Sequence, residues 1–193
     1  MIPLHVLTGF LGAGKTTLLS ALLQDPSGER IAVLVNEVGD LAIDHHLLER
    51  IDEDILALPS GCICCTMKSE MAEAIERVLA RGPTRIVLET TGLADPAPIL
   101  HGLTTDPRLT RALTIAGVIA VADAARIDGL LDTHPEVRRQ LDMADRIVLT
   151  KGDLAGELGD LQRVATLVAG APFATAVSTR PKHLVTCFRM ATA

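Results

Sequence analysis

The 193-residue sequence has no tryptophan, no tyrosine and only three phenylalanines. Apolar residues nevertheless make up 48% of it, so its core must be built from leucine, isoleucine, valine and alanine. That composition is typical of α/β proteins with buried parallel strands. An excess of basic residues is also absent, because the formal net charge is −6. This charge argues against nucleic acid or an acidic membrane as a partner.

The sequence also lacks long apolar runs and a recognisable leader. No apolar run approaches the roughly 20 residues that a membrane-spanning helix needs. The first residues, MIPLHVLTGF, lack the basic start of a signal peptide and lead directly into a glycine-rich motif. We therefore expect a cytoplasmic protein. In that compartment thiols stay reduced, and a cluster of cysteines more often binds a metal ion than forms disulfides.

What the sequence does contain is a regular alternation of apolar runs with amphipathic stretches. Strands are expected at residues 2–8, 31–36, 85–89, 116–123, 146–150 and 173–178, and helices at 15–24, 67–82, 136–144 and 157–170. Strands that alternate with helices predict an α/β fold with a mostly parallel sheet flanked by helices. The polar motifs GFLGAGKTT, NEVGD, ETTG and TKGD each follow a strand directly. They should meet at one edge of the sheet, where ligands bind.

The first of these motifs, GFLGAGKT at 9–16, matches every fixed position of the phosphate-binding pattern G-x-x-x-x-G-K-[ST]. Its glycines let backbone amides approach phosphate oxygens, and the following helix adds its positive N-terminal end. Lys15 is expected to act in catalysis at the β- and γ-phosphates, and Thr16 to bind Mg²⁺. A glycine-rich turn with a chance lysine explains the full match poorly. The expected nucleotide-binding residues of this loop are Gly9, Gly12, Ala13, Gly14, Lys15, Thr16 and Thr17.

Two later motifs predict the rest of a nucleotide site. In RIVLETTG (85–92), Glu89 is expected near Mg²⁺ and the amide of Gly92 near the γ-phosphate. In TKGD (150–153), the Lys151 stem can cover a purine while its head group stays in solvent. Asp153 can accept from the ring N–H and the exocyclic amine of guanine, a donor pair that adenine lacks, so this motif predicts GTP. The alternatives are a glutamate that caps a turn and an aspartate that begins a helix.

The stretch GCICC at 61–65 places Cys62, Cys64 and Cys65 together. A disulfide between adjacent cysteines would be strained, and a C-x-x-C redox pair would not normally contain a third cysteine. Core packing fits poorly with the loop-forming residues on either side. The pattern favours thiolate ligation of a soft ion such as Zn²⁺. Three thiolates are one fewer than the four ligands of a closed structural zinc site, and an incomplete site suits a cargo ion that must leave. The fourth cysteine, Cys187, lies in an alternating run that is typical of a core strand.

The acidic segment at 36–49 follows the second expected strand, where P-loop proteins often have a nucleotide-sensing switch. Glu37 is the first candidate for a further metal ligand, with a solvated turn residue as the alternative. His45 and His46 fit a solvated face better. Asp40 and Asp44 are candidates for orienting the attacking water, because no glutamine directly follows Gly92. Glu37, Asp40 and Asp44 therefore join Lys15 as catalytic candidates.

Taken together, GFLGAGKTT, NEVGD with Asp44, GCICC, ETTGLADP and KGDL resemble the CobW-type P-loop GTPases. These are relatives of the GTPases that help to load nickel into urease and hydrogenase. The resemblance covers residues 2 to about 180. It implies a P-loop NTPase fold, slow hydrolysis of GTP to GDP with Mg²⁺, and a thiolate site that handles Zn²⁺ or Co²⁺. It also implies a client metalloprotein, and a partner or a nucleotide-dependent homodimer would complete catalysis.

Two features depart from the family pattern. Thr150 stands where the base-reading motif usually has asparagine, although its hydroxyl can still donate and accept. Family members usually carry a second domain, so we expect a GTPase domain over 1–180 and the first strand of a truncated C-terminal domain in 181–193. Two other functions remain open: an ATP-dependent P-loop kinase or ATPase with a structural zinc, and a non-catalytic metal sensor or buffer.

Overall fold

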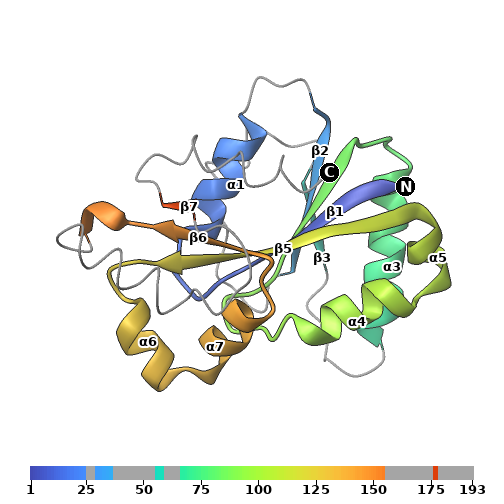
Figure 1. The fold of residues 1–193 in the computed structure, drawn as a ribbon. Coiled ribbons are helices and arrows are strands. Elements are labelled where there is room, and N and C mark those ends of the chain that lie inside the picture. Colours follow the sequence, from blue (N-terminus) through green and yellow to red (C-terminus); the bar gives the residue numbers. More distant parts are fainter. Residues whose placement is uncertain (25–28, 37–54, 59–65, 155–175, 178–193) are drawn as a thin grey trace.

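The computed structural model describes residues 1–24, 29–36, 55–58, 66–154 and 176–177. In this part of the chain seven parallel strands form one sheet in the order β3-β2-β4-β1-β5-β6-β7 (Figure 1). The predicted α/β fold with a parallel sheet is confirmed. The strands are β1 Ile2–Thr8, β2 Ile31–Asn36, β3 Ile55–Leu58, β4 Arg85–Glu89, β5 Leu113–Asp123, β6 Arg146–Thr150 and β7 Ala176–Val177.

The described helices are α1 Lys15–Leu23, α3 Thr66–Leu79, α4 Ala97–Thr105, α5 Pro107–Ala112, α6 Ile127–Thr133 and α7 Pro135–Asp142, with a 3-10 turn η1 at Gly152–Leu154. Four predicted strands, β1, β2, β4 and β6, have the expected bounds. The strand expected at 116–123 begins earlier, at Leu113. Strand β3 and helices α4, α5 and α6 were not predicted. The helix expected at 157–170 and the second domain expected from 181 lie outside the described residues.

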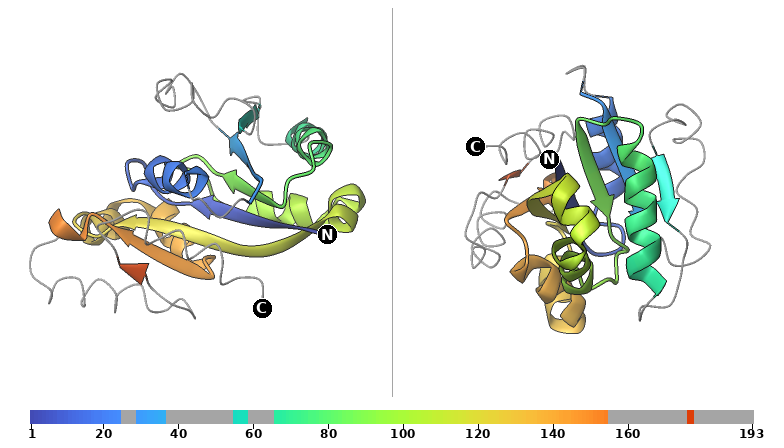
Figure 2. Two further views of the ribbon diagram at one scale, coloured as in Figure 1. Left: turned by 90° about the horizontal axis from the view of Figure 1, so that it is seen from above. Right: turned by 90° about the vertical axis from the view of Figure 1, so that its right-hand side faces the viewer.

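Within the described residues, more helices cover one face of the sheet than the other. On one face, Leu4, Val6 and Leu88 pack against α3, α4 and α5. On the other, Leu7, Val33 and Val87 pack against α1. Figure 2 shows this arrangement, with α1 and α3 on opposite sides of strands β2 and β4. Helices α6 and α7 lie on the same face as α3, α4 and α5 and cover β5 and β6. Because both faces are covered, the central strands consist of almost uninterrupted apolar residues, as in other buried parallel sheets.

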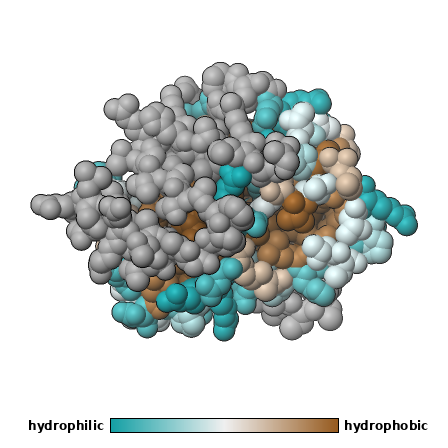
Figure 3. Space-filling model, in the orientation of Figure 1, coloured by the Kyte–Doolittle hydropathy of each residue, from teal (hydrophilic) through white to brown (hydrophobic). Residues whose placement is uncertain are grey.

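In the orientation of Figure 1, apolar side chains gather over the right-hand part of the molecule, where β1 and β5 lie (Figure 3). Within the described residues, no helix combines the length and the apolar character that a membrane crossing requires.

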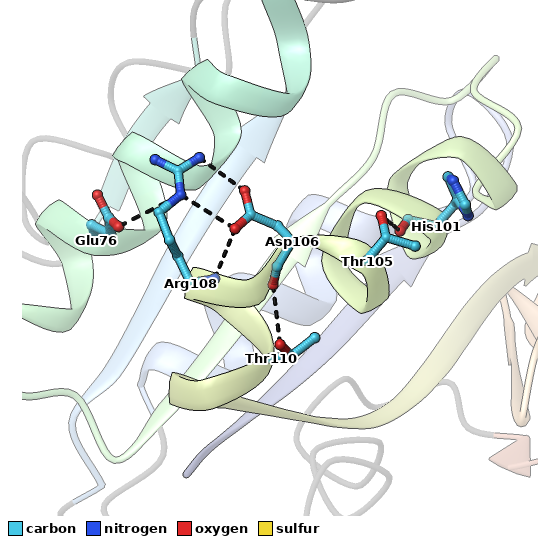
Figure 4. Close-up of polar contacts among 6 residues, drawn as sticks. All are labelled: Glu76, His101, Thr105, Asp106, Arg108 and Thr110. Atoms are coloured by element: carbon cyan, nitrogen blue, oxygen red, sulfur yellow. Dashed lines mark hydrogen bonds and ion pairs between the residues drawn. The ribbon is translucent and has the colours of Figure 1, made fainter.

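A polar cluster fixes the junction between α4 and α5 (Figure 4). Asp106 ends α4 and caps α5, because its carboxylate accepts from the Arg108 backbone N–H at 2.8 Å. The Arg108 guanidinium also donates to Asp106 at 2.8 Å and lies 4.0 Å from Glu76 of α3. These hydrogen bonds from Arg108 hold the pKa of Asp106 below its usual value. The cluster therefore joins three helices of one layer at their surface.

The pairing of β1 with β5 contains one irregularity, in the middle of β1. The register shifts between Leu4 and His5, opposite Gly117, whose φ of 148° lies in a region that favours glycine. The adjacent Val118 N–H donates to Asp145 at 2.7 Å. Beyond this bulge Thr8 pairs with Ala120, so β5 extends past β1 and ends at Asp123.

His5 lies in the middle of β1 and is fully buried. Burial, reinforced by the positive charges of Arg85 and Arg146, lowers its pKa to about 4. The Arg85 guanidinium lies 3.4 Å from His5 Nδ1 and pairs with Glu29 at 3.1 Å. A neutral imidazole beside a paired arginine is the arrangement that burial favours.

Candidate nucleotide-binding site

The carboxyl ends of four adjacent strands, β4, β1, β5 and β6, meet at one edge of the sheet. The register pairs Leu7 with Glu89 and Asp123 with Thr150. The predicted convergence of GFLGAGKTT, ETTG and TKGD on one edge is therefore confirmed. Only the first residue of NEVGD, Asn36 at the end of β2, lies within the described part of the chain. In parallel α/β sheets this edge is where ligands bind.

The loop between β1 and α1 has the backbone of a phosphate cradle. Gly9, Gly12 and Gly14 have φ values of 140°, 73° and 100°, which residues with a side chain rarely adopt. A Cβ at Gly9 would also collide with the carbonyl oxygen of Val121 in β5. Gly14 is the N-cap of α1, so the amides of the first helical turn are directed toward the loop. The cradle fits a phosphate group because it combines amide donors with the positive end of a helix.

Lys15 begins α1 and places its ammonium group against this loop. Its Nζ donates to the carbonyl oxygen of Gly9 at 2.7 Å and to that of Phe10 at 3.4 Å. Burial lowers the pKa of Lys15, and the nearby charge of Glu89 acts in the opposite direction. A buried ammonium group interacts more strongly with phosphate oxygens than one exposed to water. Thr16 and Thr17 follow in the first turn and are exposed.

The loop after β4 is attached to the end of β1 and lies against the phosphate loop. Thr90 donates from its hydroxyl to that of Thr8 at 3.0 Å and from its backbone N–H to the carbonyl oxygen of Leu7 at 2.9 Å. A Cβ at Gly92 would lie 2.7 Å from the backbone nitrogen of Leu11, so only glycine fits this contact. Glu89 is buried, and its carboxylate with the Thr16 hydroxyl gives an oxygen donor set that fits Mg²⁺.

The loop after β6 is bonded to the phosphate loop through two side chains. The Thr150 hydroxyl donates to the carbonyl oxygen of Ala13 at 2.6 Å, and the carbonyl oxygen of Ala122 lies at 3.2 Å as a second, longer acceptor for the same hydrogen. Lys151 donates to the carbonyl oxygen of Gly12 and pairs with the Asp123 carboxylate, both at 2.8 Å. The Lys151 side chain remains 37% exposed, and these two acceptors hold its head group against the phosphate loop. Asp153 lies in η1 and is exposed.

Two residues of this edge were missed by sequence reasoning. Asp123 ends β5 as Glu89 ends β4, and that shared position could have identified it. Gln140 gave no such signal. Its side chain, 1% exposed, donates from α7 to the carbonyl oxygens of Gly92 at 3.1 Å and Ala94 at 3.0 Å.

The proposed transition-metal ligands and water-orienting residues are not part of the described structure. Among the residues that are described, no group of three His, Cys, Asp or Glu side chains could hold a metal ion. The predicted residues outside the described ranges are Glu37, Asp40, Asp44, His45, His46, Cys62, Cys64, Cys65 and Cys187.

Comparison with known proteins agrees with this geometry. The sequence model of the family described as the CobW/HypB/UreG nucleotide-binding domain matches residues 3–175. The zinc chaperone YjiA of Escherichia coli (strain K12) is 40% identical over an alignment of 181 residues that covers 90% of this chain and 57% of that protein. The zinc-regulated GTPase metalloprotein activator 1 of Schizosaccharomyces pombe is 38% identical over an alignment of 162 residues that covers 79% of this chain and 39% of that protein.

A solved structure gives the same result for the fold. The Zn(II)-bound YjiA GTPase from E. coli superimposes with a TM-score of 0.68 at 30% identity, covering 92% of this chain and 57% of that one. The fold is therefore that of a P-loop NTPase. The chain spans about half the length of the relatives it matches.

Proposed function

The chain belongs to the CobW/HypB/UreG nucleotide-binding domain family, and on this basis we propose that it is a GTP-hydrolysing metallochaperone. It would bind GTP and Mg²⁺ at the sheet edge, hold a transition-metal ion on its cysteines, and deliver that ion to a client protein. The observation that carries the proposal is the convergence of the phosphate loop, the Gly92 loop and the Thr150–Lys151 loop on one edge. The relatives named as a zinc chaperone and a zinc-regulated GTPase support the choice of zinc as cargo, with Co²⁺ as the alternative.

Each residue at the edge has a proposed part in binding the nucleotide. Lys15 would place its ammonium group on the β- and γ-phosphates, and Gly92 would donate its amide to the γ-phosphate. Asp153 would accept from guanine, and its exposure leaves it accessible to a base. Thr16 and Glu89 would hold Mg²⁺, which, when bound, neutralises negative charge on the phosphates. Asp40 or Asp44 would orient the attacking water.

The cargo would be held by Cys62, Cys64 and Cys65, with Glu37 as the first candidate for a fourth ligand. Glu37 follows β2 directly, in the segment proposed to respond to the nucleotide. When the γ-phosphate is lost by hydrolysis, this segment would relax and the thiolates would release the ion. Such coupling requires that the metal have different affinities for the GTP-bound and GDP-bound states.

A nucleotide competition experiment tests the proposed activity. GTP, ATP and their diphosphates would compete with a fluorescent GDP analogue, and phosphate release would be followed with and without Zn²⁺. We expect binding that prefers guanine and slow release of phosphate. Equal affinity for ATP and GTP would favour a P-loop ATPase with a structural zinc. Metal binding with no phosphate release, even with a client added, would favour a sensor or buffer.

A further inference from the structure

Gln140 contacts the backbone of the loop that follows β4 in the candidate site. It lies in α7, and its Nε2 donates to the carbonyl oxygens of Gly92 and Ala94. A carboxamide nitrogen has two hydrogens, and this geometry uses both. The opposite orientation of the amide would bring Oε1 against two carbonyl oxygens, so the network fixes the assignment. Oε1 is buried and has no hydrogen-bond partner among the described residues.

The other side of the Gly92 loop is restrained as well. Gly92 is buried and approaches Leu11 so closely that a Cβ would lie 2.7 Å from the Leu11 nitrogen. Gly92 is therefore held between the phosphate loop and the Gln140 side chain. If the donor were removed, a buried carbonyl oxygen would lose its partner and the loop would be expected to shift.

The same geometry excludes one obvious function for this glutamine. Its two N–H groups are committed to backbone carbonyls, and its side chain is 1% exposed. It therefore cannot orient an attacking water in the way that glutamines of some GTPases do. The Gln140 side chain can instead determine the position of the Gly92 carbonyl group, which lies one peptide unit away from the amide that would meet a γ-phosphate.

We infer that Gln140 is a positioning residue that holds the Gly92 loop ready for the γ-phosphate, so that it favours triphosphate over diphosphate nucleotides. This inference rests on the proposed function for its nucleotide. A diphosphate makes no contact at the γ-position, so its affinity should not depend on Gln140. The asymmetry between the two nucleotides separates positioning from a general contribution to folding.

The test compares Gln140→Met, which has similar volume but no donor, with Leu141→Ala in the same helix. Leu141 is also buried and lines the same small cavity as Gln140, next to Phe10 and Val137. For Gln140→Met we expect affinity for a non-hydrolysable GTP analogue and kcat to fall about tenfold, with GDP affinity changed by less than about twofold. For Leu141→Ala, thermal stability should fall while the ratio of the two affinities stays that of the wild type. An unchanged ratio in Gln140→Met would overturn the inference.

Hydrogen exchange in the absence of nucleotide provides a second measurement that does not depend on GTP. We expect the peptide covering residues 90–96 to exchange about tenfold faster in Gln140→Met than in the wild type, and not in Leu141→Ala. Unchanged exchange in this peptide would also overturn the inference. Failure of the wild type to bind any guanine nucleotide would instead refute the proposed function, and the exchange result would still decide the role of Gln140.

Discussion

The Thr150 hydroxyl donates a 2.6 Å hydrogen bond to the carbonyl oxygen of Ala13, a residue 137 positions earlier in the sequence. The bond joins the end of β6 to the phosphate loop, and Lys151 adds a second bond to Gly12 next to it. The loop expected to read the base and the loop expected to hold the phosphates are thus one hydrogen-bonded unit. Threonine therefore braces the phosphate loop at a position where the family usually has asparagine.

Replacing Thr150 with valine keeps the shape of the side chain but removes this hydroxyl. One hydrogen bond contributes about 1 kcal/mol, so GTP and GDP affinities should both fall about fivefold. Both should fall equally because Ala13 lies in the loop that would hold the phosphates common to the two nucleotides. Isothermal titration calorimetry with both nucleotides would measure the change. Thr133→Val, which removes a 2.7 Å hydroxyl bond to Gly129 within α6, is the matched control and should leave both affinities unchanged.

Asp153→Asn should change base preference more than phosphate binding. Asparagine can donate where aspartate can only accept, so guanine loses one of its two partners. Xanthine has a carbonyl oxygen in place of the exocyclic amine, so it can accept a hydrogen bond from the asparagine amide at the point where guanine loses its partner. We expect GTP affinity to fall about tenfold or more and xanthosine triphosphate affinity to rise. A variant with unaltered base preference would show that Asp153 does not contact the base.

Lys15→Ala should reduce nucleotide binding more than any other single change at the site. The ammonium group is the charged donor of the phosphate loop, and a charge-assisted hydrogen bond contributes about 2–3 kcal/mol. Affinity for GTP and GDP should therefore fall by about 100-fold. Circular dichroism should show that the variant stays folded. Binding within about threefold of the wild type would contradict the assigned role of Lys15.

Much of the fold could be predicted because its signals are local. An uninterrupted apolar run such as RIVLE ends at a polar motif, and β4 has the predicted bounds. Strand β3 was missed because ILAL is too short for periodicity to separate strand from helix. Helix α4 was missed because APILHGLTT contains a glycine and two threonines, which are weak helix formers.

The residues of the candidate site likewise divide into those with a local sequence signal and those brought together only by the fold. Gly9, Lys15 and Glu89 could be proposed as site residues because each belongs to a motif that follows a strand. The contact between Gln140 and Gly92 joins residues 48 positions apart, and only tertiary packing brings them together. The ion pair between Lys151 and Asp123 was not predicted for a similar reason, because Asp123 lies at the end of a neighbouring strand.

His5 should make stability depend on pH. Its pKa is about 4 in the folded chain against the ordinary value of 6.5, so unfolding takes up a proton between these values. Stability is therefore fully present above pH 6.5 and falls as the pH drops toward 4. Between pH 7 and 5 this amounts to about 2 kcal/mol. Urea unfolding would measure the free energy of unfolding of the wild type and of His5→Gln, which cannot titrate, at both pH values. The loss between pH 7 and 5 should be larger in the wild type by that amount, and parallel pH profiles would exclude His5 as the source.

The affinity of the reduced protein for Zn²⁺, measured by chelator competition with a GTP analogue, with GDP and without nucleotide, tests the proposed coupling most directly. We predict that the affinities with GTP analogue and with GDP differ by at least about fivefold. By linkage, Zn²⁺ should change the relative affinity for the two nucleotides by the same factor. Replacing Cys62, Cys64 and Cys65 with serine should abolish both effects. A Zn²⁺ affinity that is the same in all three nucleotide states would contradict the coupling of GTP to metal release.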